Sequence, residues 1–199
     1  MNSLGCPQGC SSNYPKVKRD WSKLFQSNIV TPTYTSKLIS TIALVGSPNV
    51  GKSLIFNSLT GTYSTVSNYP GTTVEISQGE AFIAGKTVTV IDTPGMYSFL
   101  TITEEERVTR DLLFTKSVDL VIHVVDAKNL GRMLSLTLQL IEARLPVLLV
   151  VNMIDEVERL GMWVDKKKLE KALGIPVVKM SALLKLGIQE LKAKIATYV

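Results

Sequence analysis

Apolar residues recur along this 199-residue chain with two spacings, one typical of strands and the other of helices. Short apolar runs bounded by turn residues predict strands, and longer segments with an apolar residue at every third or fourth position predict helices. The expected strands span residues 40–45, 74–83, 86–91, 119–125, 146–151 and 176–180. The expected helices span residues 52–60, 104–116, 131–143, 166–173 and 186–197.

The order of these elements defines the expected fold. Strands and helices alternate, which favours a sheet with helices on both faces. The turn 84–86 joins two strands so closely that they are expected to pair antiparallel. The runs 119–125 and 146–151 are apolar almost throughout, as in strands covered on both faces, and His123 is expected to be a buried core histidine. The chain therefore predicts a doubly wound α/β fold, with a six-stranded, mostly parallel sheet and one antiparallel edge strand.

The first part of the chain lacks this periodicity. Residues 1–37 predict a partly disordered N-terminal extension with a short helix near residues 21–25, and residues 38–199 predict one globular domain. Cys6 and Cys10 both lie in the extension, where two ligands do not complete a zinc site. The sequence leaves their role open.

Composition and charge restrict the class of protein only broadly. Hydrophobic residues make up 45% and charged residues 20% of the chain, as in soluble globular proteins. The apolar runs are too short to cross a bilayer, and no signal peptide is evident. We therefore expect the chain, taken alone, to be soluble and cytoplasmic. The net charge of +5 is compatible with nucleic acid or anionic lipid but indicates neither.

The segment Gly46–Ser53, with the sequence GSPNVGKS, follows an expected strand and opens an expected helix. In that context it matches a P-loop, whose backbone N–H groups cradle phosphates. Lys52 is expected to neutralise the β- and γ-phosphates, and Ser53 is expected to offer its hydroxyl to Mg²⁺. The pattern predicts a nucleoside triphosphate site without naming the base.

Two further segments are expected to contact Mg²⁺ and the γ-phosphate. Asp92 follows a strand, where its carboxylate is expected to reach Mg²⁺ through water, and Gly95 offers a backbone N–H to the γ-phosphate. In the loop after the P-loop helix, Thr73 is the candidate second hydroxyl ligand of Mg²⁺ and Thr72 is the alternative. The sequence alone does not choose between them.

Polar residues after the last two strands indicate which base is bound. Asp155 can accept hydrogen bonds from the N1–H and the N2 amino group of guanine, a donor pair that adenine lacks. Asn152 is expected to tie its loop to the P-loop, and the N–H of Ala182 is expected near guanine O6. The expected nucleotide contacts are Asn49, Val50, Gly51, Lys52, Ser53, Leu54, Asp92, Gly95, Asn152, Met153, Asp155, Ser181, Ala182 and Leu183.

These motifs, in this order, predict a GTPase domain, and finer details of the sequence resemble the N-terminal G domain of FeoB-type ferrous-iron transporters. The resemblance covers residues 40–198 and rests on Ser67–Glu75, Pro94–Ser98, Glu104–Asp111, Val125–Leu130, Leu136–Leu140, and Met153 in place of the usual Lys. It implies a P-loop GTPase fold of the TrmE-Era type. It also implies slow, Mg²⁺-dependent hydrolysis of GTP to GDP.

The resemblance further implies a switch that regulates Fe²⁺ passage through a membrane-embedded iron-permease domain, at the cytoplasmic face of the inner membrane. No such domain is present in this sequence, so we expect the chain to be a fragment of a longer protein. A nucleic-acid partner is not expected, and homo-oligomerisation is left open. The alternative is a cytosolic GTPase of the Era and TrmE kind in ribosome or tRNA maturation, which the basic pI favours slightly.

The expected catalytic groups are Lys52, Asn49, Thr73 and Gly95. Met96 stands where Ras-like proteins have the Gln that orients water. Water must then be oriented otherwise, and the candidates are backbone groups of the loop 64–73 and the side chains of Glu104, Glu105 and Glu106. No arginine is identified as an arginine finger, because Arg107 and Arg110 are expected on the outer face of a helix.

The resemblance suggests K⁺ as a substitute for such an arginine, because G proteins with Asn at the position of Asn49 are often activated by K⁺. The ion would bind Asn49 Oδ1 and the carbonyls of Ser67 and Tyr69, and would supply positive charge beside the phosphates. This sequence departs from the family at Ser67 and Tyr69, where Gly and Trp are common.

Overall fold

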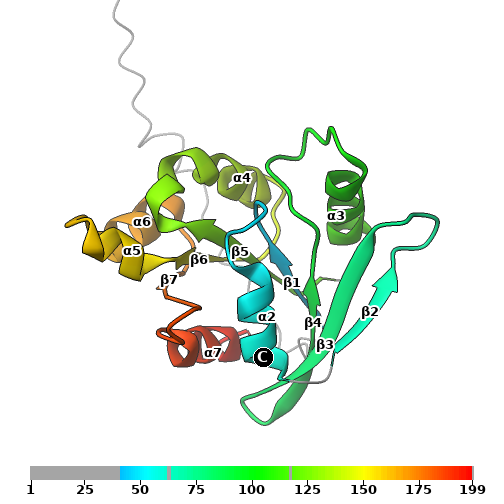
Figure 1. Cartoon of the computed structure of the whole chain (residues 1–199), viewed down its shortest axis with the longest axis horizontal. Coiled ribbons are helices and arrows are strands. Elements are labelled where there is room, and N and C mark those ends of the chain that lie inside the picture. The colour runs from blue at the N-terminus through cyan, green and yellow to red at the C-terminus, as the bar shows by residue number, and fades with distance from the viewer. Residues whose placement is uncertain (1–40, 62–63, 117, 199) are drawn as a thin grey trace, which may run out of the picture. The chain divides into compact units, whose positions relative to one another are not determined.

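Seven strands form one sheet in the computed structural model, which describes residues 41–61, 64–116 and 118–198 (Figure 1). The strands are β1 (Thr41–Val45), β2 (Ser64–Asn68), β3 (Glu75–Ile83), β4 (Lys86–Asp92), β5 (Leu120–Asp126), β6 (Val147–Asn152) and β7 (Val177–Lys179). Their order is β2-β3-β4-β1-β5-β6-β7. Strands β4, β1, β5, β6 and β7 are parallel, whereas β3 is antiparallel to β4 and β2 is antiparallel to β3.

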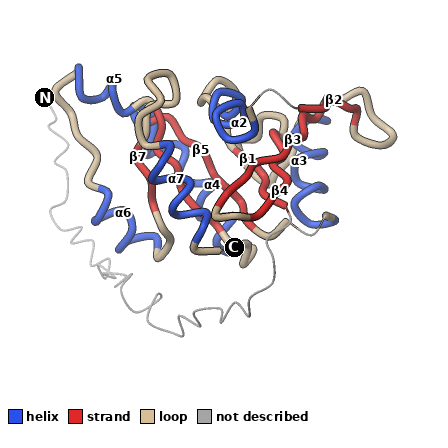
Figure 2. Tube along the Cα trace, turned by 90° about the horizontal axis from the view of Figure 1, so that it is seen from below, coloured by secondary structure: helices blue, strands red, loops and turns tan. Residues whose placement is uncertain are grey.

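Helices cover both faces of the sheet. They are α2 (Lys52–Thr60), α3 (Glu104–Thr115), α4 (Leu130–Glu142), α5 (Ile154–Arg159), α6 (Lys166–Leu173) and α7 (Ile188–Ala196), with a short 3₁₀ helix η1 (Ala127–Asn129). Alternate residues of a strand point to opposite faces. In β1, Leu44 therefore packs with α2 and α7, whereas Val45 packs with α3 and α4. Figure 2 shows α3 beside the β2–β4 end of the sheet and α6 beside β7.

The predicted fold class is confirmed, including the antiparallel edge, but the sheet has seven strands and not six. The additional strand is β2, within a segment expected to be a loop. Its sequence STVSN has one apolar residue, and all five of its residues are exposed, so no hydrophobic alternation marks it. Its backbone pairs with β3 from Ser64 opposite Gly79 to Asn68 opposite Glu75. Backbone pairing, with one side-chain hydrogen bond from Thr65 Oγ1 to the Gln78 carbonyl, therefore makes this strand.

One helix was also not expected. Helix α5 has six residues, too few for a helical repeat to be recognised in the sequence. The boundaries of the other elements agree with the expected ranges to within two residues. The expected extension 1–37, its short helix near 21–25 and Cys6 and Cys10 lie outside the described residues. Among the described residues, each helix is too short or too polar to cross a membrane.

The parallel strands place five loops at one edge of the sheet, because the carboxyl ends of parallel strands meet there. Strand β1 leads into Gly46–Ser53, β4 into residues 93–103, and β5 into η1. Strand β6 leads into α5, and β7 leads into the loop before α7. Ligands of open α/β sheets bind at this edge.

His123 is buried in β5, as expected from the sequence. It is 1% exposed, and its Nδ1 lies 2.9 Å from Oγ1 of the fully buried Thr137 in α4. Burial, with a smaller contribution from the charge of Lys52, lowers the pKa of His123 to about 3. His123 is therefore neutral in the folded protein over the ordinary pH range.

This burial predicts a pH dependence of stability. In the unfolded chain His123 binds a proton below pH 6.5, whereas in the folded chain it does so only near pH 3. The unfolded state is thus favoured as the pH falls through this window, by up to about 5 kcal/mol. The double variant His123→Leu/Thr137→Val should lose less stability than the wild type between pH 6.5 and pH 4, measured by urea unfolding. Thr137→Val alone should keep the wild-type slope, and identical slopes for all three proteins would contradict the assignment.

Candidate functional site

The loop Gly46–Ser53 wraps closely against its neighbours. Gly51 precedes α2 with φ of 92°, and a Cβ on it would lie 2.4 Å from Asn152 Nδ2. A Cβ on Gly46 would lie 2.2 Å from the backbone oxygen of Val124. Both positions therefore require glycine. The N-terminus of α2, the natural place for an anion, follows directly.

Lys52 lies over this loop. Its Nζ donates hydrogen bonds to the carbonyl oxygens of Gly46 and Ser47, both at 3.0 Å, and the residue is 8% exposed. Burial lowers the pKa of Lys52, and the nearby carboxylate of Asp92 partly opposes this effect. A phosphate at this position would place negative charge next to the desolvated ammonium group and stabilise its charged form.

Ser53 and Asp92 meet at the end of β4. Ser53 Oγ donates a hydrogen bond of 2.6 Å to Asp92 Oδ2. Asp92 Oδ1 is buried and is the one such side-chain atom without a partner among the described residues. Burial raises the pKa of Asp92, and the Ser53 hydroxyl and Lys52 oppose that shift. A hydroxyl beside an unpaired carboxylate oxygen is a donor set that suits Mg²⁺, so these residues fit the ion expected from the sequence.

The segment 93–103, which follows Asp92, is held in place at its start. The N–H of Met96 donates to the carbonyl of Gly46 at 3.1 Å, and the Met96 side chain is fully buried. Gly95 lies against Pro48, since a Cβ on Gly95 would be 2.5 Å from Pro48 Cγ. Gly95 therefore sits against the phosphate loop, as its expected contact with a γ-phosphate requires. Met96, a core residue, leaves no side chain here to orient water.

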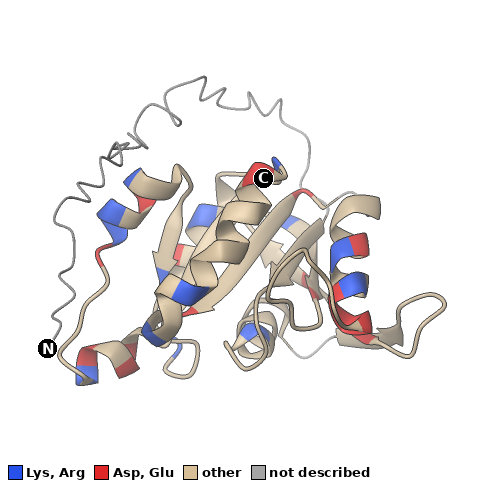
Figure 3. Cartoon of the chain, turned by 90° about the horizontal axis from the view of Figure 1, so that it is seen from above, with Lys and Arg blue, Asp and Glu red and all other residues tan. Residues whose placement is uncertain are grey.

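Glu106 holds the far end of the same segment. Its carboxylate accepts hydrogen bonds from the backbone N–H groups of Tyr97, Ile102 and Thr103, the last as part of a capping box at the start of α3. These bonds, with that from Ile102 the largest, lower the pKa of Glu106. The acidic first turn of α3 is visible in Figure 3. Because its oxygens are occupied, Glu106 is a structural anchor and is removed from the candidates for orienting water.

The hydroxyls of Thr72 and Thr73 differ in whether they are already engaged in hydrogen bonds. The Thr72 hydroxyl donates to the carbonyl of Tyr69 at 3.0 Å and accepts from the N–H of Val74, so it is used within its own turn. The Thr73 side chain is exposed and lines a cleft of about 610 Å³ together with Glu104 and Glu105. Thr73 is thus the freer hydroxyl, although no contact joins it to Ser53 or Asp92 in this conformation.

The structure does not bring the three candidate K⁺ ligands together. Ser67 lies in β2, which β3 and β4 separate from β1, a distance of about 14 Å at usual strand spacing. The Tyr69 carbonyl already accepts from the N–H and Oγ1 of Thr72. Asn49 is exposed in the phosphate loop, with φ of 63°. The segment containing β2 must move before these groups can share an ion.

Asn152 connects three loops of the site. Its Nδ2 donates to the carbonyl of Val50 at 2.8 Å, and its Oδ1 accepts from the N–H of Ala182 at 2.9 Å. The expected tie to the P-loop is therefore present, together with a second tie that the sequence did not reveal. Asn152 is 2% exposed and Ser181 is 1% exposed, whereas Leu183 is 74% exposed. Asn152 and Ser181 are therefore held in the interior, and Leu183 lies at the surface.

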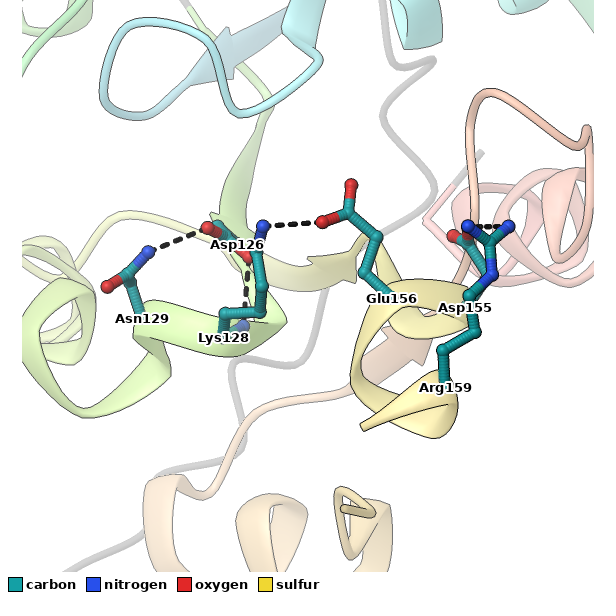
Figure 4. A network of polar contacts seen from close by, with 6 residues as sticks. All are labelled: Asp126, Lys128, Asn129, Asp155, Glu156 and Arg159. Carbon is teal, nitrogen blue, oxygen red and sulfur yellow. Dashed lines mark hydrogen bonds and ion pairs between the residues drawn. The ribbon is translucent and has the colours of Figure 1, made fainter. Parts of the chain in front are cut away.

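Asp155 stands at the first turn of α5, after Met153 in the left-handed conformation with φ of 60°. Figure 4 shows its carboxylate facing Arg159, whose Nη2 lies 3.4 Å away. An arginine side chain presents a pair of N–H donors much as the guanine edge does. The same figure shows Lys128 of η1 paired with Glu156 of α5. Sequence reasoning missed both pairs. Asp155 and Arg159 stand four residues apart on α5, whereas Lys128 and Glu156 lie on different elements and share no spacing in the sequence.

This fold and this site define a P-loop nucleotide-binding domain of the G-domain type. Comparisons with known proteins agree. Residues 40–195 match the family model for ferrous iron transport protein B, and the chain belongs to this family. The resemblance noted in the sequence is thereby confirmed.

Solved structures and curated relatives support the same assignment. The G domain of the T. maritima FeoB iron transporter is 42% identical, covers 80% of this chain and 98% of its own, and has a TM-score of 0.75. The Methanococcus jannaschii FeoB G-domain is 43% identical over 80% of this chain and 96% of its own, with a TM-score of 0.71. The Fe(2+) transporter FeoB of Escherichia coli K12 is 39% identical over 162 residues, which are 79% of this chain and 21% of that protein. This chain therefore spans about a fifth of the length of the curated relatives it matches.

The Asn152 bridge yields a prediction. Asn152→Ala should leave the Val50 carbonyl and the Ala182 N–H without partners, lowering the free energy of unfolding by about 2–4 kcal/mol. It should also weaken GDP binding, because two loops of the site lose their connection. Urea unfolding and titration with a fluorescent GDP analogue measure the two effects. Asn57→Ala, on the exposed side of α2, is the control and should change neither quantity; unchanged GDP affinity in Asn152→Ala would contradict the bridging role.

Proposed function

We propose that this domain binds GTP and GDP with Mg²⁺ and slowly hydrolyses GTP to GDP and phosphate. The observation that carries the proposal is the double hydrogen bond of Asn152, which ties the phosphate loop to Ala182. A nucleotide whose phosphates bind Lys52 and whose base binds Asp155 would span the loops that Asn152 connects. Ser53 and Asp92 would hold Mg²⁺ beside the phosphates, with Thr73 joining when a γ-phosphate is present.

Guanine is the proposed base, because Asp155 offers one carboxylate to two donors. The ion pair of Arg159 with Asp155 is consistent with this role, since the Asp155 carboxylate already faces a pair of N–H donors. Met153, Leu54 and Leu183 would contribute apolar contact around the base. Residues 38–199 are the proposed extent of the G domain.

Iron transport is the proposed biological setting. The curated relatives are named Fe(2+) transporter FeoB, and this chain corresponds to about a fifth of their length. We propose that the G domain regulates Fe²⁺ passage through a membrane-embedded part of the same protein, from the cytoplasmic face of the membrane. The family assignment favours this role over the alternative in ribosome or tRNA maturation.

Base selection tests the nucleotide proposal. The chain should bind GDP and GTP but not ATP, and its hydrolysis of GTP should be on the order of 10⁻⁴ to 10⁻² s⁻¹ and cease when EDTA removes Mg²⁺. Asp155→Asn should lower the affinity for GTP by about 10²-fold, since a charge-assisted pair of hydrogen bonds is lost. Calorimetry and phosphate release measure binding and turnover. Glu158→Gln, an exposed residue of the same helix, is the matched control, and equal binding of ATP and GTP would refute the guanine site.

We further propose that K⁺ activates hydrolysis through Asn49 Oδ1 and the carbonyls of Ser67 and Tyr69. Two of these ligands lie in or next to β2, so this segment would have to approach Asn49 for the three groups to share an ion. Hydrolysis should be roughly tenfold faster in KCl than in NaCl. Asn49→Ala should remove the difference while retaining GDP affinity. Equal rates of the wild type in the two salts would reject the K⁺ role.

A further inference from the structure

The loop between α5 and α6 exposes three apolar side chains that are nearly adjacent in the sequence. Leu160 is 63% exposed, Met162 is 48% exposed and Trp163 is 83% exposed, and we call these three residues the apolar tip. The tip follows α5 and precedes α6, at the opposite end of the sheet from β2 (Figure 1). Apolar side chains gathered at a surface mark a place of contact with another molecule or with a membrane.

Backbone hydrogen bonds hold the apolar tip in place. The N–H of Met162 donates to the carbonyl of Val157 at 3.1 Å, as in a Schellman motif, and Gly161 takes the left-handed conformation with φ of 69°. At the other end of the loop, Asp165 Oδ1 accepts from the N–H of Lys168 at 3.1 Å and caps α6. Both ends of the loop are thus fixed, and the fold itself keeps these apolar side chains at the surface.

A cleft of about 340 Å³ opens beside the apolar tip. Helices α4, α5 and α6 each contribute to it, so it is part of the packed domain. Its apolar lining consists of Leu130, Val157, Met162, Trp163 and Leu169. A hydrocarbon chain that reached the tip would therefore find further apolar surface next to it.

Basic side chains flank the apolar tip on both sides in the sequence. Arg159 precedes it, and Lys166–Lys168 follow it at the start of α6, where Figure 3 shows the basic positions in blue. The segment 159–171 contains five basic and two acidic residues. Within the described ranges Lys167 and Lys171 are exposed and have no ion pair, and they lie one turn apart on α6. Positive charge thus borders the apolar surface.

This combination matches the chemistry of an anionic lipid surface. Tryptophan is enriched where protein meets the boundary between headgroups and acyl chains, and aliphatic side chains enter that boundary. Lysines beside them are attracted to anionic headgroups. Single-stranded nucleic acid also binds basic and aromatic groups, but it stacks its bases on successive aromatic rings, whereas the neighbours of Trp163 here are aliphatic.

We propose that Leu160, Met162 and Trp163 rest on an anionic phospholipid bilayer, with Lys167 and Lys171 against its headgroups. The inference goes beyond the nucleotide chemistry, and only the presence of a bilayer beside the domain rests on the proposed function. The described helices do not cross a membrane, so this contact is one of surface binding. It would orient the G domain with the β7 end of its sheet toward the membrane.

Vesicle binding tests this surface. The chain should bind vesicles made of equal parts phosphatidylglycerol and phosphatidylcholine more tightly than vesicles of phosphatidylcholine alone. Added salt should weaken the binding, because it screens the lysines from the headgroups. The chain has two tryptophans, and Trp21→Phe leaves Trp163 as the only one. Its fluorescence should then shift to shorter wavelength when the mixed vesicles are added, as the indole leaves water.

Two changes at the apolar tip and α6 separate the contributions. Trp163→Ser should lower the association constant for the mixed vesicles by about tenfold, because the burial of one indole is lost. Phe82→Ser is the matched control, since Phe82 is 71% exposed on β3 and should not contact the bilayer. Lys167→Gln/Lys171→Gln should also lower it by about tenfold, but should not change binding to phosphatidylcholine alone.

The charge variant has its own control, and the outcomes are distinct. Lys86→Gln/Lys116→Gln removes the same charge elsewhere on the domain and should bind vesicles as the wild type does. Absence of vesicle binding, or equal binding to both kinds of vesicle, would overturn the inference. It would also be overturned if Trp163→Ser instead abolished self-association in sedimentation or binding of single-stranded RNA, with vesicle binding unchanged. GDP affinity is measured for each variant and should be unchanged; a chain that binds vesicles but not GDP would refute the nucleotide function alone.

Discussion

The parallel direction of five neighbouring strands is the constraint on which this molecule depends. Because β4, β1, β5, β6 and β7 all end at one edge, loops far apart in the sequence become neighbours there. Asn152 shows the result most directly, since it bonds to the carbonyl of Val50 across 102 positions of the chain. A buried amide with both ends satisfied is costly to disturb. The relative positions of these loops are thus set by the sheet and by the hydrogen bonds of Asn152.

The two halves of the site are held in different ways. On the base side, buried hydrogen bonds link rigid elements. On the γ-phosphate side, the segment 93–103 is held at its start by the buried Met96, whose N–H donates to the Gly46 carbonyl, and further on by Glu106 and by Gln139 Oε1, which accepts from the N–H of Phe99 at 2.8 Å. Near the phosphates, burial opposes the charges of both Lys52 and Asp92. A bound nucleotide with Mg²⁺ would offset this desolvation of Lys52 and Asp92.

Much of this was accessible from the sequence, for identifiable reasons. The helices and the buried strands follow from hydrophobic spacing, and the phosphate loop, Asp92 and loop 152–155 follow from short motifs whose chemistry is local. Strand β2 was missed because its pairing depends mainly on the backbone and its exposed residues show no hydrophobic alternation. The anchor role of Glu106 was missed because a carboxylate that accepts backbone N–H groups looks, in sequence, like any acidic helix start.

Strand β2 has a consequence beyond nucleotide chemistry. It is the outermost strand, and its five residues are exposed and uncharged. The outer side of such a strand presents backbone donors and acceptors to any extended peptide, including the same strand of another molecule. Proteins usually protect such borders with lysine, proline or a bulge, and β2 itself carries neither lysine nor proline. In the conformation described, β2 therefore leaves one border of the sheet open to pairing with another extended strand.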